Sequence, residues 1–293
     1  MRDIAPPTGL ARRGRRLSEP ETERRMLEAA LAEVKRSGLT VSLDSISMED
    51  IIREAHVSRS AAYRRWPYKD LFVSDLVKVL AEEVAPSPAD HEAIIGVIKA
   101  VAAEHDSLLD TAKGRHGLLV EVFRQTALAD FKAVYGSPEW RTYLALHATF
   151  TSLPEGRLRA EVQATLARSQ QGFIGRVAGA WEQMAGLFGY RLRPELGASY
   201  EVLATLVSAF SRGLVLMSLS MPDLVEERLT AAPFGAAATE QWSLAATGMA
   251  AVGFAFFEPD PAVEWGSERV AMVRQALASL RAVPCLPPKP AEN

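Results

Sequence analysis

Basic side chains gather in one short stretch of this sequence. Four of them occur there with no acidic residue between them: Arg59, Arg64, Arg65 and Lys69. Guanidinium groups grip phosphates and can bind guanine O6 and N7 through two parallel hydrogen bonds. The stretch therefore indicates contact with a nucleic acid. Its spacing alone is equally compatible with a solvated basic face on a small helical bundle.

Residues suited to catalysis or metal binding are scattered. The histidines are His56, His91, His105, His116 and His147. No two of them have the spacing of a metal-binding helix, and Cys285 is the single cysteine. In Glu104-His105-Asp106 adjacent helical residues point in different directions, so they form no triad. The sequence predicts neither an enzyme nor a metal site, and it indicates no cofactor.

The charge is unevenly distributed along the chain. The formal net charge is −3, but residues 1–80 hold 15 Lys and Arg against 12 Asp and Glu, and the remainder holds 18 against 24. A basic head on an acidic body favours a polyanionic partner for the head. Four arginines within residues 12–16 predict a flexible basic arm over 1–17. We expect this arm to reach the DNA backbone or minor groove, with a solvated tail as the alternative.

Two short helical patterns flank a tight turn at the start of the basic stretch. Ser47 is placed to cap the first helix, and Ser58 is placed to cap the second, which Pro67 ends. In the second helix Ala62 and Trp66 have the small or apolar character that inward positions need. Two capped helices of this length predict a helix-turn-helix, whose second helix enters the major groove.

The rest of the chain has the pattern of longer helices. Helices are expected over 94–108, 140–147, 154–188, 194–220 and 267–281. The uncharged run 241–257 is short for a bilayer span, so we expect it to be a buried helix. No alternating pattern indicates a strand. The expected fold class is all-α, with an N-terminal three-helix helix-turn-helix domain and a larger C-terminal helical domain.

The Pro-rich segment 85–89 marks a domain boundary. The expected parts are the basic arm, a DNA-binding domain over 18–84, a regulatory and dimerisation domain over 90–283, and a disordered tail over 284–293. A helix that is apolar on nearly all sides needs cover, so helices at about 197–219 and 238–257 are expected to pair in a homodimer. A helix covered wholly within its own subunit is the alternative.

A family resemblance sharpens the prediction for the N-terminal domain. The run AHVSRSAAYRRWPYKDLF, with MLEAALAEVKRSG before it, resembles the DNA-binding domain of the TetR family of transcriptional regulators over residues 20–83. The matching positions are Ala55, Val57, Ser58, Tyr63, Trp66, Lys69, Asp70 and Phe72. The resemblance implies that Tyr63 and Lys69 grip phosphates, and that residues 59–61 face bases. The segment RLRPELGASYEVLATLVSAFSRGLVL more faintly resembles the start of the family's dimerisation helix.

One residue departs from the family pattern. His56 stands where the pattern usually has glycine, which adopts a positive φ without steric cost. We expect histidine to adopt that conformation with some strain.

These observations define two sets of candidate residues. The expected DNA-binding residues are Ser47, Ser58, Arg59, Ser60, Ala61, Tyr63, Arg64, Arg65 and Lys69. A small-molecule site is expected to be mostly apolar with a few polar groups. Its candidates are His105, Phe123, Trp140, Tyr143, His147, Phe173, Arg176 and Phe210. A histidine satisfied within the core is the alternative for His105.

The sequence therefore predicts a cytoplasmic, homodimeric transcriptional regulator, with a repressor favoured. It would bind a palindromic double-stranded operator and leave it when a small-molecule effector binds the C-terminal domain. The alternatives are a DNA-binding regulator without a ligand, and an all-α enzyme or adaptor that carries a basic helical pair. The effector, the operator sequence and the role of the helix near 267–281 do not follow from the sequence.

Overall fold

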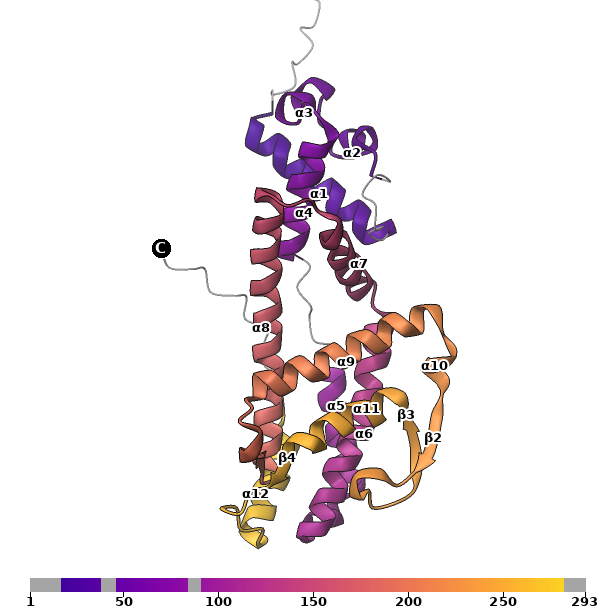
Figure 1. The fold of residues 1–293 in the computed structure, drawn as a ribbon, viewed down its shortest axis with the longest axis vertical. Coiled ribbons are helices and arrows are strands. Elements are labelled where there is room, and N and C mark those ends of the chain that lie inside the picture. Colours follow the sequence, from indigo (N-terminus) through magenta and orange to yellow (C-terminus); the bar gives the residue numbers. More distant parts are fainter. Residues whose placement is uncertain (1–16, 38–45, 84–90, 282–293) are drawn as a thin grey trace, which may run out of the picture. The chain divides into compact units, whose positions relative to one another are not determined.

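The structure, a computed structural model, describes residues 17–37, 46–83 and 91–281 (Figure 1). The N-terminal helices are α1 (Glu19–Ser37), α2 (Met48–Glu54), α3 (Arg59–Arg65) and α4 (Lys69–Glu83). The following helices are α5 (His91–Glu104), α6 (Ala112–Gly136), α7 (Pro138–Ser152), α8 (Arg157–Leu187), α9 (Tyr200–Ser220), α10 (Asp223–Glu226), α11 (Leu244–Phe256) and α12 (Ser267–Ser279). Short 3-10 turns lie at Asp106–Asp110, Pro194–Leu196 and Pro233–Gly235. The mostly helical fold class expected from the sequence is confirmed.

The chain forms two compact units. The first combines the residues up to 83 with 144–163, and the second combines 84–143 with the residues from 164 onward. Helices α7 and α8 therefore contribute to both units. The expected basic arm, apart from Leu17, lies outside the described residues. So do the Pro-rich boundary segment and the C-terminal tail with Cys285.

The first unit is held together by the helices that surround α1. Helix α1 contacts α2, α3 and α4, and its Met26 is fully buried. Trp66, at the end of α3, packs edge to face on Phe72 of α4 with their ring centroids 5.1 Å apart. The Trp66 indole Nε1 donates a 2.9 Å hydrogen bond to Asp75. A buried tryptophan whose N–H is satisfied fixes the end of α3 against α4.

The second unit is built around α6, which contacts α5, α9 and α11. Its core includes Leu118, Phe188 and Trp242, all at most 1% exposed. Helix α12 packs on α5 and on the turn that follows it. Arg274 of α12 holds that turn through a 2.8 Å ion pair with Asp106. This additional helix therefore has a packing role that the sequence did not reveal.

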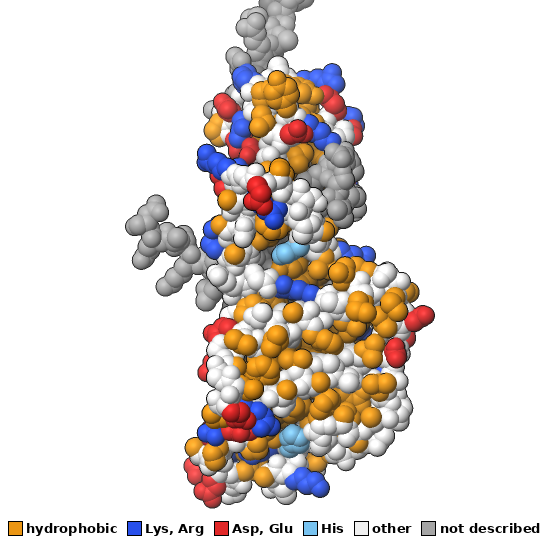
Figure 2. Space-filling view, viewed as in Figure 1, with side chains coloured by type: hydrophobic (Ala, Val, Ile, Leu, Met, Phe, Trp, Pro, Cys, Tyr) orange, Lys and Arg blue, Asp and Glu red, His pale blue; other side chains and the backbone are white. Residues whose placement is uncertain are grey.

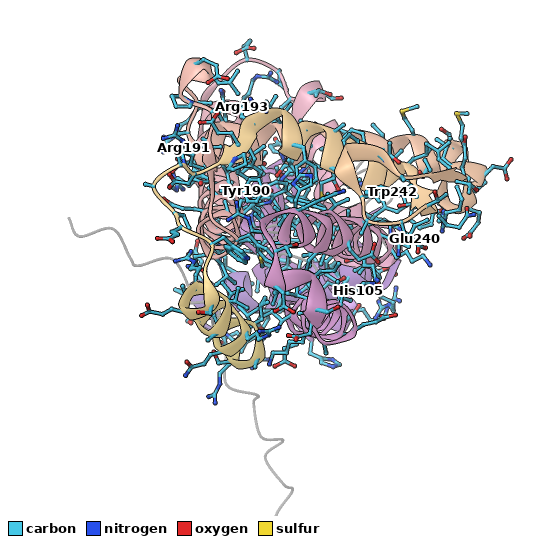
Figure 3. The ribbon with its side chains drawn as sticks, turned by 90° about the horizontal axis from the view of Figure 1, so that it is seen from below. His105, Tyr190, Arg191, Arg193, Glu240 and Trp242 are labelled. Carbon is cyan, nitrogen blue, oxygen red and sulfur yellow. The ribbon has the colours of Figure 1, made fainter. Side chains whose placement is uncertain are left out.

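The expectation of no strands is wrong for the described residues. β1 (Tyr190–Leu192) pairs antiparallel with β4 (Phe257–Pro259), and β2 (Arg228–Ala231) pairs antiparallel with β3 (Glu240–Ser243). In Figure 3 these ribbons lie apart, with Tyr190 and Arg191 on one side and Glu240 and Trp242 on the other. Each strand has only three or four residues, which is too short for an alternating pattern to be recognised.

Two expected helices begin later than the sequence suggested. Helix α9 begins at Tyr200 instead of residue 194, because Gly189 and Gly197 adopt positive φ and a 3-10 turn lies between them. Helix α11 begins at Leu244, and the residues directly before it form β3. Both helices have serine N-caps, Ser199 and Ser243, whose side chains accept a backbone N–H of the first turn.

Candidate nucleic-acid interface

The two short helices of the first unit begin at the serines that the sequence indicated. Ser47 Oγ accepts the backbone N–H of Asp50 at 3.3 Å. Ser58 Oγ accepts the backbone N–H of Ala61, also at 3.3 Å. Both serines have extended backbone conformations, as N-cap residues do. The predicted starts of the two helices are confirmed.

The turn between α2 and α3 closes as a Schellman motif. The N–H of His56 donates to the carbonyl of Arg53 at 3.3 Å, and the N–H of Val57 donates to the carbonyl of Ile52 at 3.2 Å. Val57 and Ile52 are both buried, which supplies the apolar contact of this motif. His56 itself has φ of 52°, so the predicted left-handed histidine is confirmed. This left-handed conformation strains a residue that has a Cβ. The His56 side chain is exposed, so it gains no burial that could offset the strain.

Helix α3 divides its side chains between the core and the solvent. Ala62 is buried, and Ala61 is 9% exposed, so little of the Ala61 methyl group reaches the surface. The outward side chains are those of Arg59, Ser60, Tyr63 and Arg64. Lys69 is partly exposed where α4 begins. Most of the expected DNA-binding side chains therefore share the outer surface of α3 and the start of α4.

Arg65 differs from the other basic residues of α3. Its Nε donates to Glu23 of α1 at 2.9 Å, and its Nη2 donates to Asp75 of α4 at 3.0 Å. Its Cζ lies 5.0 Å from the centroid of the Trp66 ring. The hydrogen bond to Glu23 raises the pKa of Arg65. These contacts hold α1, α3 and α4 together, a structural role that the basic stretch alone did not indicate.

Glu49 of α2 is a residue that sequence reasoning missed. Its Oε2 accepts Nε of Arg59 at 2.7 Å and lies 2.5 Å from Nη2 of the same residue. Its Oε1 accepts the hydroxyl of Tyr63 at 2.9 Å. The contact with Arg59, followed by that with Tyr63, lowers the pKa of Glu49, and the same carboxylate raises the pKa of Tyr63. One carboxylate thus orients two outward residues of α3.

A shallow cavity of about 460 Å³ adjoins this pair. It is lined by Glu49, Ile52, Arg53, His56, Val57 and Arg59. The side chain of Arg59 is 71% exposed, so it can leave Glu49 without breaking the core. Glu49 occupies the Nε and Nη2 edge of the guanidinium and leaves the Nη1 side for another acceptor.

The residues expected to form a small-molecule site fall into several places in the second unit and one in the first. Trp140, Tyr143 and Phe173 do come together, with the Trp140 ring centroid 5.4 Å from that of Tyr143 and 5.9 Å from that of Phe173. Arg212 of α9, which the sequence did not single out, lies among these three rings at 5.0–5.5 Å from their centroids.

The remaining candidates lie elsewhere. The Phe123 ring packs at an angle against the rings of Trp181 and Phe254, and His105 Nδ1 bonds to the carbonyl of Val101 at 3.2 Å. Phe210 fills the space above Gly248, where α9 crosses α11. Arg176 is exposed on α8, and His147 belongs to the other compact unit. In Figure 3 His105 lies well away from Tyr190. The eight candidates therefore do not line one common site.

Among the described residues, His, Cys, Asp and Glu side chains form no group of three or more that could hold a metal ion. Helix α9 alone among the described helices is long and apolar enough, by length and composition, to cross a membrane, and 39% of its most apolar window is buried.

Comparison with known proteins gives only distant likenesses. No protein-family model matches the chain, and no curated protein matches it. The solved structures that are similar at a low level include two regulators. Reduced NemR from E. coli is 14% identical, with 69% of this chain and 89% of that chain covered and a TM-score of 0.38. TylP, a TetR regulator from Streptomyces fradiae, is 16% identical, with 90% and 93% covered and a TM-score of 0.35.

Proposed function

We propose that the chain is a transcriptional regulator of the TetR type that binds a palindromic DNA operator as a homodimer. The observation that carries this proposal is the outer surface of α3. This helix is capped by Ser58, follows a tight turn after α2, and presents four side chains to solvent: Arg59, Ser60, Tyr63 and Arg64. The proposed site of action is the cytoplasm, and no catalytic role is assigned.

In the proposed complex, α3 lies in the major groove with its first turn at the base edges. Arg59 and Ser60 are in that turn, so they read bases, and Arg59 suits guanine best. Tyr63, Arg64 and Lys69 lie further along and bind phosphates, which sets the register of the helix on the duplex. Ser47 and Ser58 act chiefly as caps that hold both helices at their correct start.

The proposed dimer forms through α9 and α11. One face of α9 exposes residues at alternating spacings of four and three, namely Val202, Leu206, Ala209, Gly213 and Leu216. Leu216 is 59% exposed, and a Cβ at Gly213 would meet nothing within 4 Å. On the face drawn in Figure 2, hydrophobic side chains spread over the region where α9 and α11 run in Figure 1. An apolar face of this kind fits a second copy of itself about a two-fold axis.

Regulation is proposed to follow from the dimer. Two α3 helices must enter successive major grooves about 34–36 Å apart. A small molecule in the second unit favours a state in which this separation is wrong, and the operator is released because the ligand binds that state more tightly. The proposal is therefore that of a repressor whose effector acts through the arrangement of the two copies.

The experiment that tests this function is operator binding measured as a function of salt. Lys69→Ala should weaken binding to all duplexes and reduce the slope of log affinity against log salt by about one. Tyr63→Phe should weaken binding to all duplexes equally, although it removes no positive charge from the protein. Arg157→Ala serves as the control, because Arg157 is 93% exposed and pairs with Glu161 within α8, outside the helix-turn-helix. Equal effects of Lys69→Ala and Arg157→Ala would contradict the interface.

A further inference from the structure

Arg212 is the most unusual charged residue of the second unit. It lies on α9, the helix of the proposed dimer face, but its guanidinium points inward among Trp140, Tyr143 and Phe173. Its Nη1 donates a 2.8 Å hydrogen bond to Oε1 of Gln170, which also accepts the hydroxyl of Tyr143 at 2.6 Å. We call these five residues the Arg212 cluster. It joins α7, α8 and α9.

The other edge of this guanidinium makes no hydrogen bond to a described residue. Arg212 Nε and Nη2 are buried and make no hydrogen bond. No Asp or Glu among the described residues acts on the pKa of Arg212, which burial lowers although contact with Tyr143 partly raises it. A buried cation without a counter-ion is unfavourable, because its lost hydration is not replaced. Nε and Nη2 lie on one edge of the guanidinium plane, which is the fork that a carboxylate binds through two parallel hydrogen bonds.

A second buried arginine shows why the edge matters. Arg115 also has two buried nitrogens without partners, but they are Nε and Nη1, which do not share an edge. Its Cζ lies 4.5 Å from the ring centroid of Trp265, and a Cβ at Gly189 would lie 2.7 Å from its Nη1. Arg115 therefore fits a packing role, whereas Arg212 presents a complete fork.

We propose that the Arg212 cluster binds a small organic acid with an aromatic or aliphatic body. The carboxylate pairs with Nε and Nη2 of Arg212, and the apolar body packs against the rings of Trp140, Tyr143 and Phe173. A neutral ligand would leave the cation uncompensated. A phosphate dianion would bring one negative charge more than this single arginine can balance. In the present structure the edge is covered, so the acid enters by displacing ring side chains of the cluster.

This inference rests on the proposed function, since it names the class of its effector. Gln170 and Tyr143 couple the ligand to α7 and α8, and Arg212 places it directly against α9. Gly213, the next residue along α9, is exposed on the proposed dimer face. An acid that reorients Arg212 therefore changes the packing of the helix through which the two copies meet. The coupling requires tighter binding in one dimer arrangement than in the other.

The test uses the full chain and three pairs of probes: benzoate, phenylacetate and decanoate, each against its own neutral amide. Binding is measured by titration calorimetry and by tryptophan fluorescence, because Trp140 lines the cluster. At least one acid should bind one molecule per chain, and its amide should bind at least about 30-fold more weakly. Arg212→Gln should lose a similar factor, whereas Arg176→Gln, an exposed arginine on α8, should not.

A second variant protects the test against misfolding. Gln170→Glu supplies a carboxylate 2.8 Å from Nη1 of Arg212, so it should keep the fold and abolish acid binding by supplying the missing counter-ion. Acid binding that survives Gln170→Glu, equal binding of acids and amides, or no binding of any acid would each overturn the proposal. Operator binding is measured separately. If the acids bind but the chain ignores DNA, the proposed regulator function fails while the acid site stands.

Discussion

The left-handed residue in the helix-turn-helix offers a test of how the sequence compensates for local strain. His56 has φ of 52° and an exposed side chain, so replacing it with glycine removes steric strain without removing buried contacts. A non-glycine residue in this region costs about 1–2 kcal/mol. Glycine loses about 0.5–1 kcal/mol more backbone entropy on folding. His56→Gly should therefore stabilise the first unit by about 0.5–1 kcal/mol.

Amide hydrogen exchange is the suitable assay for His56→Gly, because the two compact units need not unfold together. The slowest amides of α2 and α3 should exchange about two- to five-fold more slowly than in the unchanged chain. His56→Ala is the matched control. It removes the imidazole but keeps the Cβ that clashes, so its exchange rates should stay close to those of the unchanged chain.

The comparison of glycine with alanine decides the question. If His56→Gly and His56→Ala behave alike, the backbone at residue 56 carries no strain worth relieving. If both destabilise the unit, the imidazole makes a stabilising contact that outweighs the strain at residue 56. Only a gain that is specific to glycine supports the strained Schellman turn described above.

Three further perturbations test other parts of the structure. Leu216→Glu should give a folded monomer by light scattering, whereas Leu196→Glu, at a leucine outside α9 that is 47% exposed, should leave the dimer intact. Burial raises the pKa of Asp130 to about 6 from its ordinary 3.8, so stability should fall as pH rises between about 4 and 6. The free energy of unfolding is measured with urea at several pH values. Asp130→Asn should remove its fall between about pH 4 and 6 and raise it by up to about 3 kcal/mol at neutral pH. An unchanged pH dependence would show that Asp130 is solvated. Glu49→Gln should raise the affinity for random duplexes several-fold, because the carboxylate that repels phosphates is lost. The ratio of operator affinity to random-duplex affinity should fall, because the same carboxylate orients Arg59. An unchanged ratio would contradict this.

Local signals in the sequence predicted the first unit well. Ser47 and Ser58 each accept a hydrogen bond from the residue three positions later, so their capping can be predicted without any tertiary information. The position of His56, where the family pattern usually has glycine, likewise predicted a positive φ, because that constraint belongs to the turn itself. The mostly helical class followed from apolar spacing repeated over long segments.

Features that depend on distant residues were not predictable. Glu49 lies ten residues before Arg59, and their contact exists only once the turn has folded α2 against α3. The Arg212 cluster draws on three helices, so its arginine looked like an ordinary charge within an apolar helix. The contacts of Arg65 with Glu23 and Asp75 have the same origin, since these residues flank it only in the folded unit.

The central claim is that α3 reads a palindromic operator, and selection from a random duplex library tests it most directly. The chain and its Arg59→Ala variant are each used to enrich bound duplexes at physiological salt. The account predicts a two-fold symmetric site with half-sites about one helical turn apart. Arg59→Ala should relax one base position in each half-site, at a cost of about 1–3 kcal/mol on the selected operator. No enrichment by the unchanged chain, or an identical ranking of sequences for the two proteins, would contradict the account.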